Sequence, residues 1–428
     1  MRVRAALDPG GAVAGDRGRI LTDTTIDLAE PAMWASRFPD DLFAELRSRT
    51  PVFHQRLTDE VKSVVGREFW VCTKHEDVAR VHRDYETFTA TRGPLIQDVP
   101  LFDVYPAIVS LDPPDHTVRR RLITRAFTPR AVAKLEDGIR DRAKTMAAAL
   151  LESGGGEFVD LAAGLPISVI GDIVGIPEAD RPHVFGLIEK VLKTAGAQMS
   201  LPEGDDVMPF LELFAYASSL TAEKREHPVD DIWSALCTAE ITEESGESYL
   251  LPSNELEIFF FILGLAGADT TRNALCDGIR AFVANPDQIA AYRSGPDARR
   301  TAVEEVIRYS TPIMFWVRGA TKDVTLGGEL IPAGARVVTM LRSANRDEDV
   351  FADPFRFDIR RDPNPHQSFG GGGAHHCLGA MLARAEVRAA LDEILLNTKT
   401  IEIGEPTMTL PHLGNNMTVY DSLPVSLD

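Results

Sequence analysis

The chain has 428 residues, of which 44% are hydrophobic and 25% charged, a balance typical of globular proteins and not of disordered, fibrous or membrane-embedded ones. It has 45 Lys and Arg residues against 64 Asp and Glu residues, and the resulting charge of −19 would repel a phosphate backbone. No basic helix or basic aromatic strip offsets this charge, so nucleic acid is not an expected partner.

The N-terminal segment from Met1 to Ile20 contains charged residues and several glycines, with no apolar run. It is expected to be a flexible tail, and it lacks the features of a signal peptide or a membrane anchor. Over residues 21–428 no internal repeat, low-complexity tract or long linker separates two folding units. We therefore expect a single domain over 21–428, in a cytoplasmic protein.

The predicted secondary structure is mainly helical. A strand over Phe69–Cys72 is followed by a helix that begins at His75. Short strands are expected between Val324 and Val338, where glycine and proline supply turns. Apolar residues recur with helical spacing in three further segments, 131–152, 180–193 and 207–226. The pattern predicts a mainly α fold with a minor β-sheet region.

A helix is predicted to start at the prolines of Asp112-Pro113-Pro114-Asp115. His116 and Arg120 are four residues apart on this helix and share one face. Two donors in this arrangement suit a pair of carboxylates. A basic surface helix is the alternative, and by themselves these residues favour it.

The longest predicted helix runs from Asn254, expected as its N-cap, to Val283. Its middle, residues 258–266, is apolar on every side. Since such a helix has no polar face to turn towards water, it should pass through the interior of the molecule.

An acid and two hydroxyls, Asp269, Thr270 and Thr271, follow this apolar stretch. Polar groups inside a buried helix cost free energy unless they find partners or take part in chemistry. The simplest partner for Thr270 is the carbonyl of Ala266, four residues earlier. That bond would also open the helix where the small residues Ala266 and Gly267 leave space for a ligand.

Residues 301–309 are predicted to form a helix on which Glu305 and Arg308, three residues apart, can form an ion pair. Most ion pairs of this spacing lie on a solvated surface and have little effect on stability. Alone, the pair is weak evidence for any function.

Four consecutive glycines, residues 370–373, precede Cys377, and a helix is predicted over Ala380–Leu396. Glycine allows positive φ and lets a flat ligand approach the backbone closely. A sulfur at a helix N-terminus is stabilised as a thiolate, and oxygen-activating haem enzymes use a cysteine thiolate as iron ligand. Three alternatives stay open at this point: a flexible loop with an incidental cysteine, a His-His-Cys zinc cluster that lacks further ligands, and a nucleophilic cysteine paired with a distant histidine.

The other cysteines, Cys72, Cys237 and Cys276, are far apart and stand among apolar residues without a CxxC pair. They are predicted to be buried small hydrophobic residues and not parts of a disulfide framework or zinc site.

In this order, the Asp-Pro-Pro-Asp-His helix, Ala-Gly-Ala-Asp-Thr-Thr, Glu-x-x-Arg, Asn-Arg-Asp and the glycine-rich cysteine loop resemble the bacterial cytochromes P450, over roughly residues 65 to 400. The resemblance implies the cytochrome P450 fold around a buried haem b. It also implies an oxidoreductase, a monooxygenase that hydroxylates a C–H bond of an apolar small-molecule substrate with O2. Electrons from NAD(P)H would come through a separate ferredoxin and ferredoxin reductase, and we expect a monomer.

The resemblance also implies roles for individual residues. Cys377 would be the metal ligand, and Glu305 and Arg308 a structural pair beside it. Thr270 and Asp269 would be the catalytic alcohol and acid that deliver protons during oxygen activation. The implied haem contacts are His116, Arg120, Ala266, Gly267, Arg318, Phe369, His375 and Gly379, of which His116, Arg120, Arg318 and His375 would bind the propionates.

One departure from the commonest family pattern is the position of Phe369, eight residues before Cys377 instead of seven. A branch of the family that oxidises sterols, terpenoid chains and methyl-branched fatty acids shares this spacing, and its preceding segment is similar to residues 362–366. Substrate contacts are expected from four apolar stretches, 95–108, 184–199, 313–317 and 413–417.

Arg119, Arg121 and Arg125 are expected to contribute a basic docking patch for the ferredoxin. Two other functions stay open, a haem enzyme that uses peroxide directly and a non-catalytic haem or gas-binding module. The Asp269–Thr270 pair argues against the first, and the second does not need it.

Overall fold

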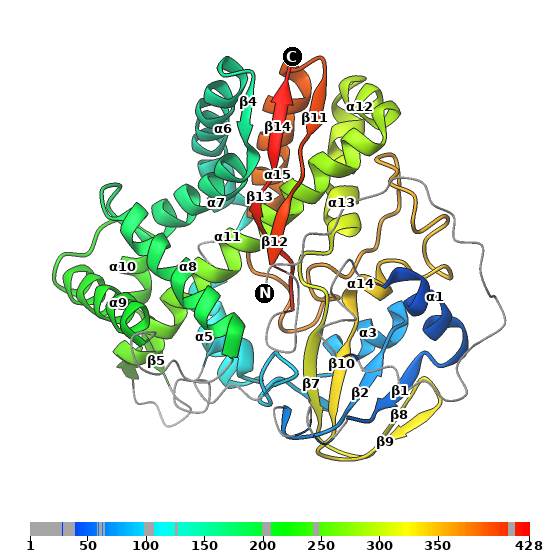
Figure 1. The fold of residues 1–428 in the computed structure, drawn as a ribbon. Coiled ribbons are helices and arrows are strands. Elements are labelled where there is room, and N and C mark those ends of the chain that lie inside the picture. The colour runs from blue at the N-terminus through cyan, green and yellow to red at the C-terminus, as the bar shows by residue number, and fades with distance from the viewer. Residues whose placement is uncertain are drawn as a thin grey trace.

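The computed structural model describes residues 28, 39–57, 59, 62, 65–97, 107–124, 127–198, 207–242, 248–409 and 416–428, with backbone alone at 129, 192–198 and 242. The predicted N-terminal tail lies outside these residues, as does Arg125. Figure 1 shows a large helical region beside a smaller sheet-rich region. The expected mainly α fold with a minor β-sheet region is confirmed.

The helices are α1 (Asp40–Arg49), α3 (His75–Arg83), η2 (Ile108–Ser110), α5 (Asp115–Thr124), α6 (Pro129–Glu152), α7 (Phe158–Val174), α8 (Arg181–Gln198), α9 (Met208–Glu226), α10 (Ile232–Cys237), α11 (Ser253–Ala284), α12 (Pro286–Arg293), α13 (Pro296–Ser310), α14 (Leu341–Ala344) and α15 (Ala380–Asn397).

The strands are β1 (Val52–Gln55), β2 (Phe69–Cys72), β3 (Phe88–Thr89), β4 (Gly155–Glu157), β5 (Glu240–Thr242), β6 (Ser248–Leu250), β7 (Trp316–Ala320), β8 (Val324–Leu326), β9 (Glu329–Ile331), β10 (Arg336–Thr339), β11 (Ile401–Ile403), β12 (Thr407–Thr409), β13 (Val419–Ser422) and β14 (Pro424–Leu427).

A five-stranded mixed sheet, in the order β1-β2-β10-β7-β3, forms most of the sheet-rich region. β10 runs parallel to β2, and the other neighbours are antiparallel. Side chains alternate between its faces: Phe69 and Val71 pack into one apolar cluster with residues of α1, while Cys72 packs into another with residues of α3. Both faces of the sheet are therefore covered.

Helix α11 passes through the helical region and packs against α7, α9, α13 and α15. Figure 1 shows it crossing behind the hairpin of β12 and β13. Residues 258–264 are all buried, which confirms the prediction of an interior helix. This position fixes Asp269 and Thr270 at the centre of the molecule.

The predicted N-cap of α11 is wrong. The helix begins at Ser253, one residue before Asn254, and no side chain caps it. Pro252 directs the chain into the helix instead, and its carbonyl accepts hydrogen bonds from the amides of Glu255 and Leu256, at 3.1 and 3.2 Å. Only Asn254 has a glutamate three residues later, Glu257, so the capping pattern favoured it, but the helix already includes Asn254 and its first turn is not capped by a side chain.

Several short strands were not predicted. β7 pairs with β3, and β14 pairs with β4, across more than 200 residues of sequence, and β11 pairs with β14 in turn. The stability of these strands therefore depends on the partner strand more than on their own composition. The predicted turns between 324 and 338 are confirmed, because Gly327 and Gly328 join β8 to β9 with positive φ values of 53° and 88°.

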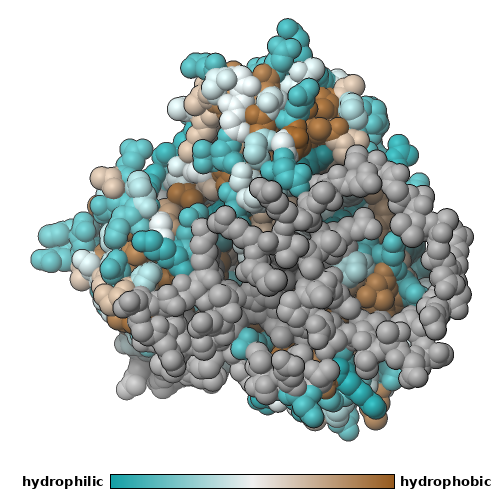
Figure 2. All heavy atoms as spheres, in the orientation of Figure 1, coloured by the Kyte–Doolittle hydropathy of each residue, from teal (hydrophilic) through white to brown (hydrophobic). Residues whose placement is uncertain are grey.

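None of the helices in the described part of the chain combines the length and hydropathy needed to cross a membrane. Figure 2 shows mostly hydrophilic side chains on the described part of the visible face, with apolar groups in small patches. Cys72, Cys237 and Cys276 are buried and unpaired, as predicted.

Candidate active site

The glycine-rich loop before α15 has the conformation that its sequence predicted. Gly370, Gly371 and Gly372 adopt positive φ values of 87°, 63° and 85°. Gly373 has an ordinary φ but lies against α3, where an added Cβ would be 1.8 Å from the carbonyl oxygen of His82. The four glycines are therefore needed for two reasons, backbone twist and close packing.

Cys377 follows this loop three residues before α15 begins. Its amide donates to the carbonyl of Phe369 at 2.9 Å. The side chain is exposed, yet surrounding protein raises the pKa of the thiol; a backbone hydrogen bond from Gly379 and the charges of Arg120 and Arg384 oppose that rise. An exposed sulfur so closely surrounded by protein suits a ligand that approaches from one side.

Four nitrogen-bearing side chains meet beside the cysteine loop. His116 and Arg120 come from α5, Arg318 from β7 and His375 from the loop itself. The rings of His116 and His375 are 4.1 Å apart, and the side chain of Arg120 donates to the carbonyl of His376. A cavity of about 410 Å³ reaches His116 and Arg120 between α5 and Ala374. The structure thus brings together residues that are up to 259 positions apart in sequence.

The electrostatics of this cluster are those of a site for anions. Burial, then the charges of Arg120 and Arg318, lower the pKa of His116 to about 4. Burial, Arg318, His116 and Arg120 lower that of His375 to about 2, and burial lowers the pKa of Arg318 to about 10. Among the residues that the structure describes, the Nε2 atoms of both histidines have no hydrogen-bond partner. Unpartnered imidazole nitrogens beside two guanidinium cations fit a dianionic ligand such as the two propionates of haem, which would favour the protonated imidazoles.

On α11, Ala266 and Thr270 are four residues apart and form an accessible strip in the middle of a largely buried helix. Ala266 is exposed and Thr270 half-buried. The Thr270 hydroxyl donates to the carbonyl of Ala266 at 2.7 Å, as predicted. The helix continues without a break from Ser253 to Ala284, so the expected opening at this bond is absent. A threonine can make this bond while the helical pattern persists.

Gly267 has a structural role that the sequence did not reveal. An added Cβ there would lie 2.6 Å from Cδ1 of Ile170 on α7, so the glycine allows α7 and α11 to pack closely. Gly379 lies just before α15, where an added Cβ would meet nothing within 4 Å.

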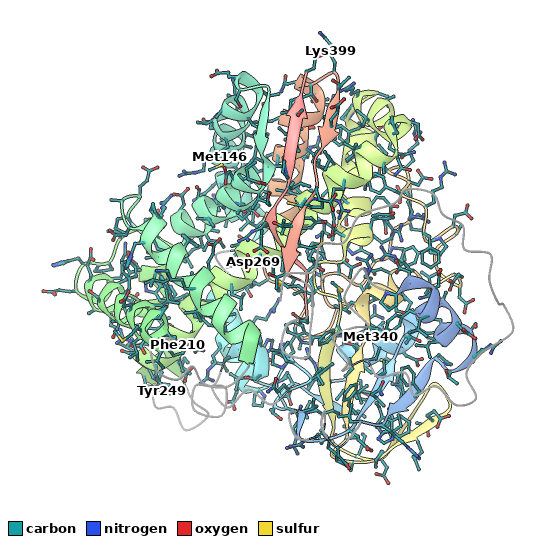
Figure 3. The ribbon with its side chains drawn as sticks, viewed as in Figure 1. Met146, Phe210, Tyr249, Asp269, Met340 and Lys399 are labelled. Carbon is teal, nitrogen blue, oxygen red and sulfur yellow. The ribbon has the colours of Figure 1, made fainter. Side chains whose placement is uncertain are left out.

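Asp269 is 3% exposed and lies at the centre of the molecule (Figure 3). One carboxylate oxygen is 2.6 Å from Nη2 of Arg272. The same nitrogen is 3.4 Å from Glu189 of α8, whose side chain is 45% exposed. A chain of charged groups therefore leads from Asp269 towards solvent. Arg272 and Glu189 were missed, although Arg272 stands three residues after Asp269 in sequence.

Glu305 and Arg308 are buried completely, and their guanidinium and carboxylate form two hydrogen bonds of 2.8 Å. Arg308 also donates to the carbonyls of Asn345 and Pro354, at 2.8 Å each. Glu305 accepts from the amide of Asp358 at 2.9 Å, among other donors. The pair is thus not a surface pair but an anchor for the irregular segment that leads to the cysteine loop.

The predicted substrate stretches are largely core where they are described. Ile96, Met314 and Phe315 belong to the apolar cluster on the α1 side of the sheet, and Val184 and Ile188 belong to the helical core. Other parts of these stretches, residues 98–106, 199 and 413–415, lie outside the described residues.

The alternative zinc cluster finds no support, since the described residues contain no group of three or more metal-ligating side chains. A nucleophilic cysteine would need a neighbouring histidine that accepts the proton of the thiol. The two histidines before Cys377, His375 and His376, are poor proton acceptors, because burial, together with nearby cations such as Arg120, lowers their pKa values. The geometry instead favours a ligand that contacts the sulfur and the anion-binding side chains together.

Comparison with known proteins supports the same ligand. The family model "Cytochrome P450" matches residues 300–417. A steroid C26-monooxygenase of Mycolicibacterium smegmatis is 36% identical over 389 residues, which cover 89% of each protein. A methyl-branched lipid omega-hydroxylase of Mycobacterium tuberculosis is 36% identical over 378 residues, 86% of this chain and 87% of that one.

The solved structures include a Mycobacterium marinum cytochrome P450 in complex with pseudoionone. Its TM-score to this chain is 0.85, at 38% sequence identity, and the match covers 94% of this chain and 98% of that one. The thiol of Cys377, the adjacent anion-binding cluster and the accessible strip of α11 have the donor types that a haem needs. With relatives this similar over most of its length, the chain belongs to the cytochrome P450 family of monooxygenases.

Proposed function

We propose that this protein hydroxylates a terpenoid, steroid or methyl-branched lipid, with electrons from a separate ferredoxin and its NAD(P)H-dependent reductase. The observation that carries the proposal is the meeting of Cys377 with four buried or half-buried nitrogen donors. The names of two relatives, a steroid C26-monooxygenase and a methyl-branched lipid omega-hydroxylase, state these substrate classes, and the Mycobacterium marinum structure contains pseudoionone. The extra glycine before Cys377 supports the same substrate class.

The cofactor would be haem b, with Cys377 as its metal ligand. His116, Arg120, Arg318 and His375 would bind its propionates, because they supply buried cations and unpartnered Nε2 atoms. Phe369 and Gly379 would lie beside the cysteine, and Ala266 and Gly267 on the opposite face. When bound, haem supplies the iron at which O2 is activated for insertion into a C–H bond.

The proton-handling groups of this chain would be Thr270 and Asp269. The reaction consumes O2, two protons and two electrons, and yields the alcohol and water, so a proton route is required. Thr270 holds a hydroxyl on the accessible strip of α11, where its proton is now directed at the Ala266 carbonyl. Asp269 is paired with Arg272, which also contacts Glu189, and these charged groups offer a route from solvent.

The basic docking patch needs one change. Arg119 forms two hydrogen bonds, of 2.7 and 2.8 Å, with Glu255 and is 16% exposed, so it is not available to a ferredoxin. Arg121 is exposed and stays in the proposal. We further propose that the protein is a cytoplasmic monomer and that residues 21–428 form one domain.

The reduced, carbon monoxide-bound protein tests the cofactor assignment. A thiolate-ligated haem gives an absorbance band at much longer wavelength than a histidine-ligated one, and Cys377→His should abolish it. Persistence of the band in Cys377→His would overturn the ligand. Spin-state changes across a steroid, terpenoid and branched-lipid library, followed by product analysis, then test the substrate class; hydroxylation of none of these with active ferredoxin would contradict it.

Thr270→Ala tests the proton route. With NAD(P)H, ferredoxin and reductase, the variant should form less product for each electron consumed and release more peroxide, because the hydroxyl that handles the proton is lost. Thr270→Ser should retain coupling. Peroxide-driven turnover that is as efficient in Thr270→Ala as in the parent, with no ferredoxin-driven turnover in either, would support the peroxide-dependent alternative instead.

A further inference from the structure

The proposed mechanism does not use a cluster of three side chains beside Phe369, in which Arg384 and His366 contact the ring and Glu304 binds both of them. The guanidinium carbon of Arg384, on α15, is 4.5 Å from the centre of the Phe369 ring. The ring of His366 is tilted by 51° to the Phe369 ring, with 5.6 Å between the ring centres. The carbonyl of Phe369 accepts the amide of Cys377, so the position of Phe369 is linked directly to that of the cysteine. Whatever holds the ring also holds the loop that presents the sulfur.

Arg384 is fixed by a forked ion pair. Its Nε and Nη2 donate to the two carboxylate oxygens of Glu304, on α13, at 2.6 and 2.8 Å. The Nε2 atom of His366 donates to the same carboxylate at 3.1 Å. A fork defines the plane of a guanidinium as well as its position, which a single contact does not. Arg384 therefore stacks on Phe369 in one orientation.

The carboxylate of this cluster is held in its charged form. Burial by itself would raise the pKa of Glu304, but hydrogen bonds from Arg384 and His366 outweigh burial and lower it to about 2. Across the working pH range the cluster is thus a fixed arrangement of charges next to the cysteine loop. It occupies the position of an outer shell around a metal ligand, the shell through which proteins adjust metal centres.

The guanidinium of Arg384 also places a positive charge beside the cysteine loop, because it stacks on Phe369, whose carbonyl accepts the amide of Cys377 at 2.9 Å. Arg120 is a second cation at this loop, where it donates to the carbonyl of His376. Arg120 belongs to the anion-binding cluster, where bound carboxylates would offset it. Arg384 is in a different environment, stacked on Phe369 and 31% exposed. A fixed positive charge favours the more negative, reduced state of a nearby redox centre.

We propose that Arg384 is a positioning residue for the haem–thiolate centre: Glu304 and His366 hold its guanidinium, which fixes the Phe369 ring and raises the reduction potential of the iron. This inference rests on Cys377 being the iron ligand. The carbon monoxide difference spectrum of each variant tests that assignment separately from the potential.

The test is the midpoint potential of the ferric/ferrous couple, measured by spectroelectrochemistry on the haem-containing enzyme. Arg384→Leu should lower it, so that at a fixed donor potential the ratio of reduced to oxidised iron falls about tenfold, or about 59 mV for one electron. Arg384→Lys keeps the charge and should retain most of the parent potential. Glu304→Gln removes a negative charge and should shift the potential upward.

Arg388 provides the matched control. It lies one turn further along α15, is 41% exposed and pairs with Asp392 at 3.6 Å, so Arg388→Leu removes the same charge from the same helix. Its potential should stay near the parent value. Equal potentials in Arg384→Leu and Arg388→Leu, with the thiolate band intact in both, would overturn the proposal.

Discussion

Glu386 is an acidic residue of α15 that helical spacing puts among the charged positions, yet its side chain is only 2% exposed. One carboxyl oxygen accepts the hydroxyl of Thr271 on α11 at 3.3 Å, and the other has no partner among the described residues. Burial raises its pKa to about 8, although the bond from Thr271 lowers it. Near neutral pH the group is therefore a protonated acid between two helices.

The first prediction concerns Glu386→Gln. Because the folded-state pKa lies above the unfolded one, the folded protein binds the proton more tightly. The stability from this group is complete below pH of about 4 and is lost as pH rises through about 8. The parent should lose on the order of 3 kcal/mol between pH 5 and 8, whereas Glu386→Gln should not.

Denaturant titrations at pH 5, 6.5 and 8 measure this difference. Glu393→Gln, on the same helix but solvated, should follow the parent at every pH. If the free energy of unfolding of Glu386→Gln fell with pH in parallel with that of the parent, the loss of stability would not come from ionisation of this carboxyl group.

At the scale of elements, helix α13 organises the irregular segment before Cys377. Glu305 receives hydrogen bonds or ion pairs from the segment at Asp358, Arg361 and Asn364, within 2.9 to 3.2 Å. Arg308 binds its carbonyls in turn. A segment without regular helices or strands cannot satisfy its own backbone groups, so these two side chains replace a hydrogen-bond ladder.

The second prediction follows from this anchoring. Glu305→Ala leaves Arg308 as a buried cation without its partner and should cost about 3–5 kcal/mol, with loss of bound haem. Glu305→Gln keeps a hydrogen-bond acceptor for Arg308, so this variant should lose less stability and less haem than Glu305→Ala. Arg300→Ala removes one member of an ion pair in which both side chains are more than 60% exposed, and thermal denaturation should show little change. Unchanged stability and haem content in Glu305→Ala would contradict the anchoring role.

The third prediction concerns the contact between the cysteine loop and α3. In Gly373→Ala the new methyl group would overlap the His82 carbonyl, so the loop must move away from the end of α3. We expect reduced haem content and a lower melting temperature. Gly138→Ala, on α6, meets nothing within 4 Å and should raise stability by about 0.5–1 kcal/mol. Full haem content in Gly373→Ala would show that the loop adapts without cost.

At the scale of the whole molecule, the sequence predicted what depends on local pattern and missed what depends on distant partners. β2 and α3 begin where alternation and periodicity indicated, and the glycine run has the expected backbone. The ion pair of Arg384 with Glu304 joins residues 80 positions apart, and no spacing within one helix reveals it. The burial of Glu386 depends on which face of α15 meets α11, which its mixed sequence does not determine.

The fourth prediction treats the cofactor as part of the fold. Arg318 is 2% exposed and its pKa is lowered by burial to about 10, so without an anionic ligand it is an unfavourably buried cation. Arg318→Leu should therefore leave the haem-free protein as stable as the parent or more stable. The haem-containing form of the same variant should melt at a lower temperature than the haem-containing parent.

Calorimetry of the parent and of Arg318→Leu, each with and without haem, measures these opposite effects on the melting temperature. Equal destabilisation of Arg318→Leu with and without haem would show that Arg318 supports the sheet and not the cofactor. Haem loading of the parent should raise its melting temperature, because a ligand that binds only the folded state stabilises it.

The fixed points of the cysteine loop lie on both sides of its glycines. Glu305 holds the chain up to Asn364, Glu304 holds His366 before the glycines and Arg384 after them, and the stretch 370–376 between them is attached to neither glutamate. The stretch is instead held from the side, because Arg83 of α3 donates to the carbonyl of Gly371 and Gly373 packs against the carbonyl of His82. The additional glycine before Cys377 therefore lengthens the loop between two fixed ends, and the contact with α3 limits how far that extra length can move the cysteine.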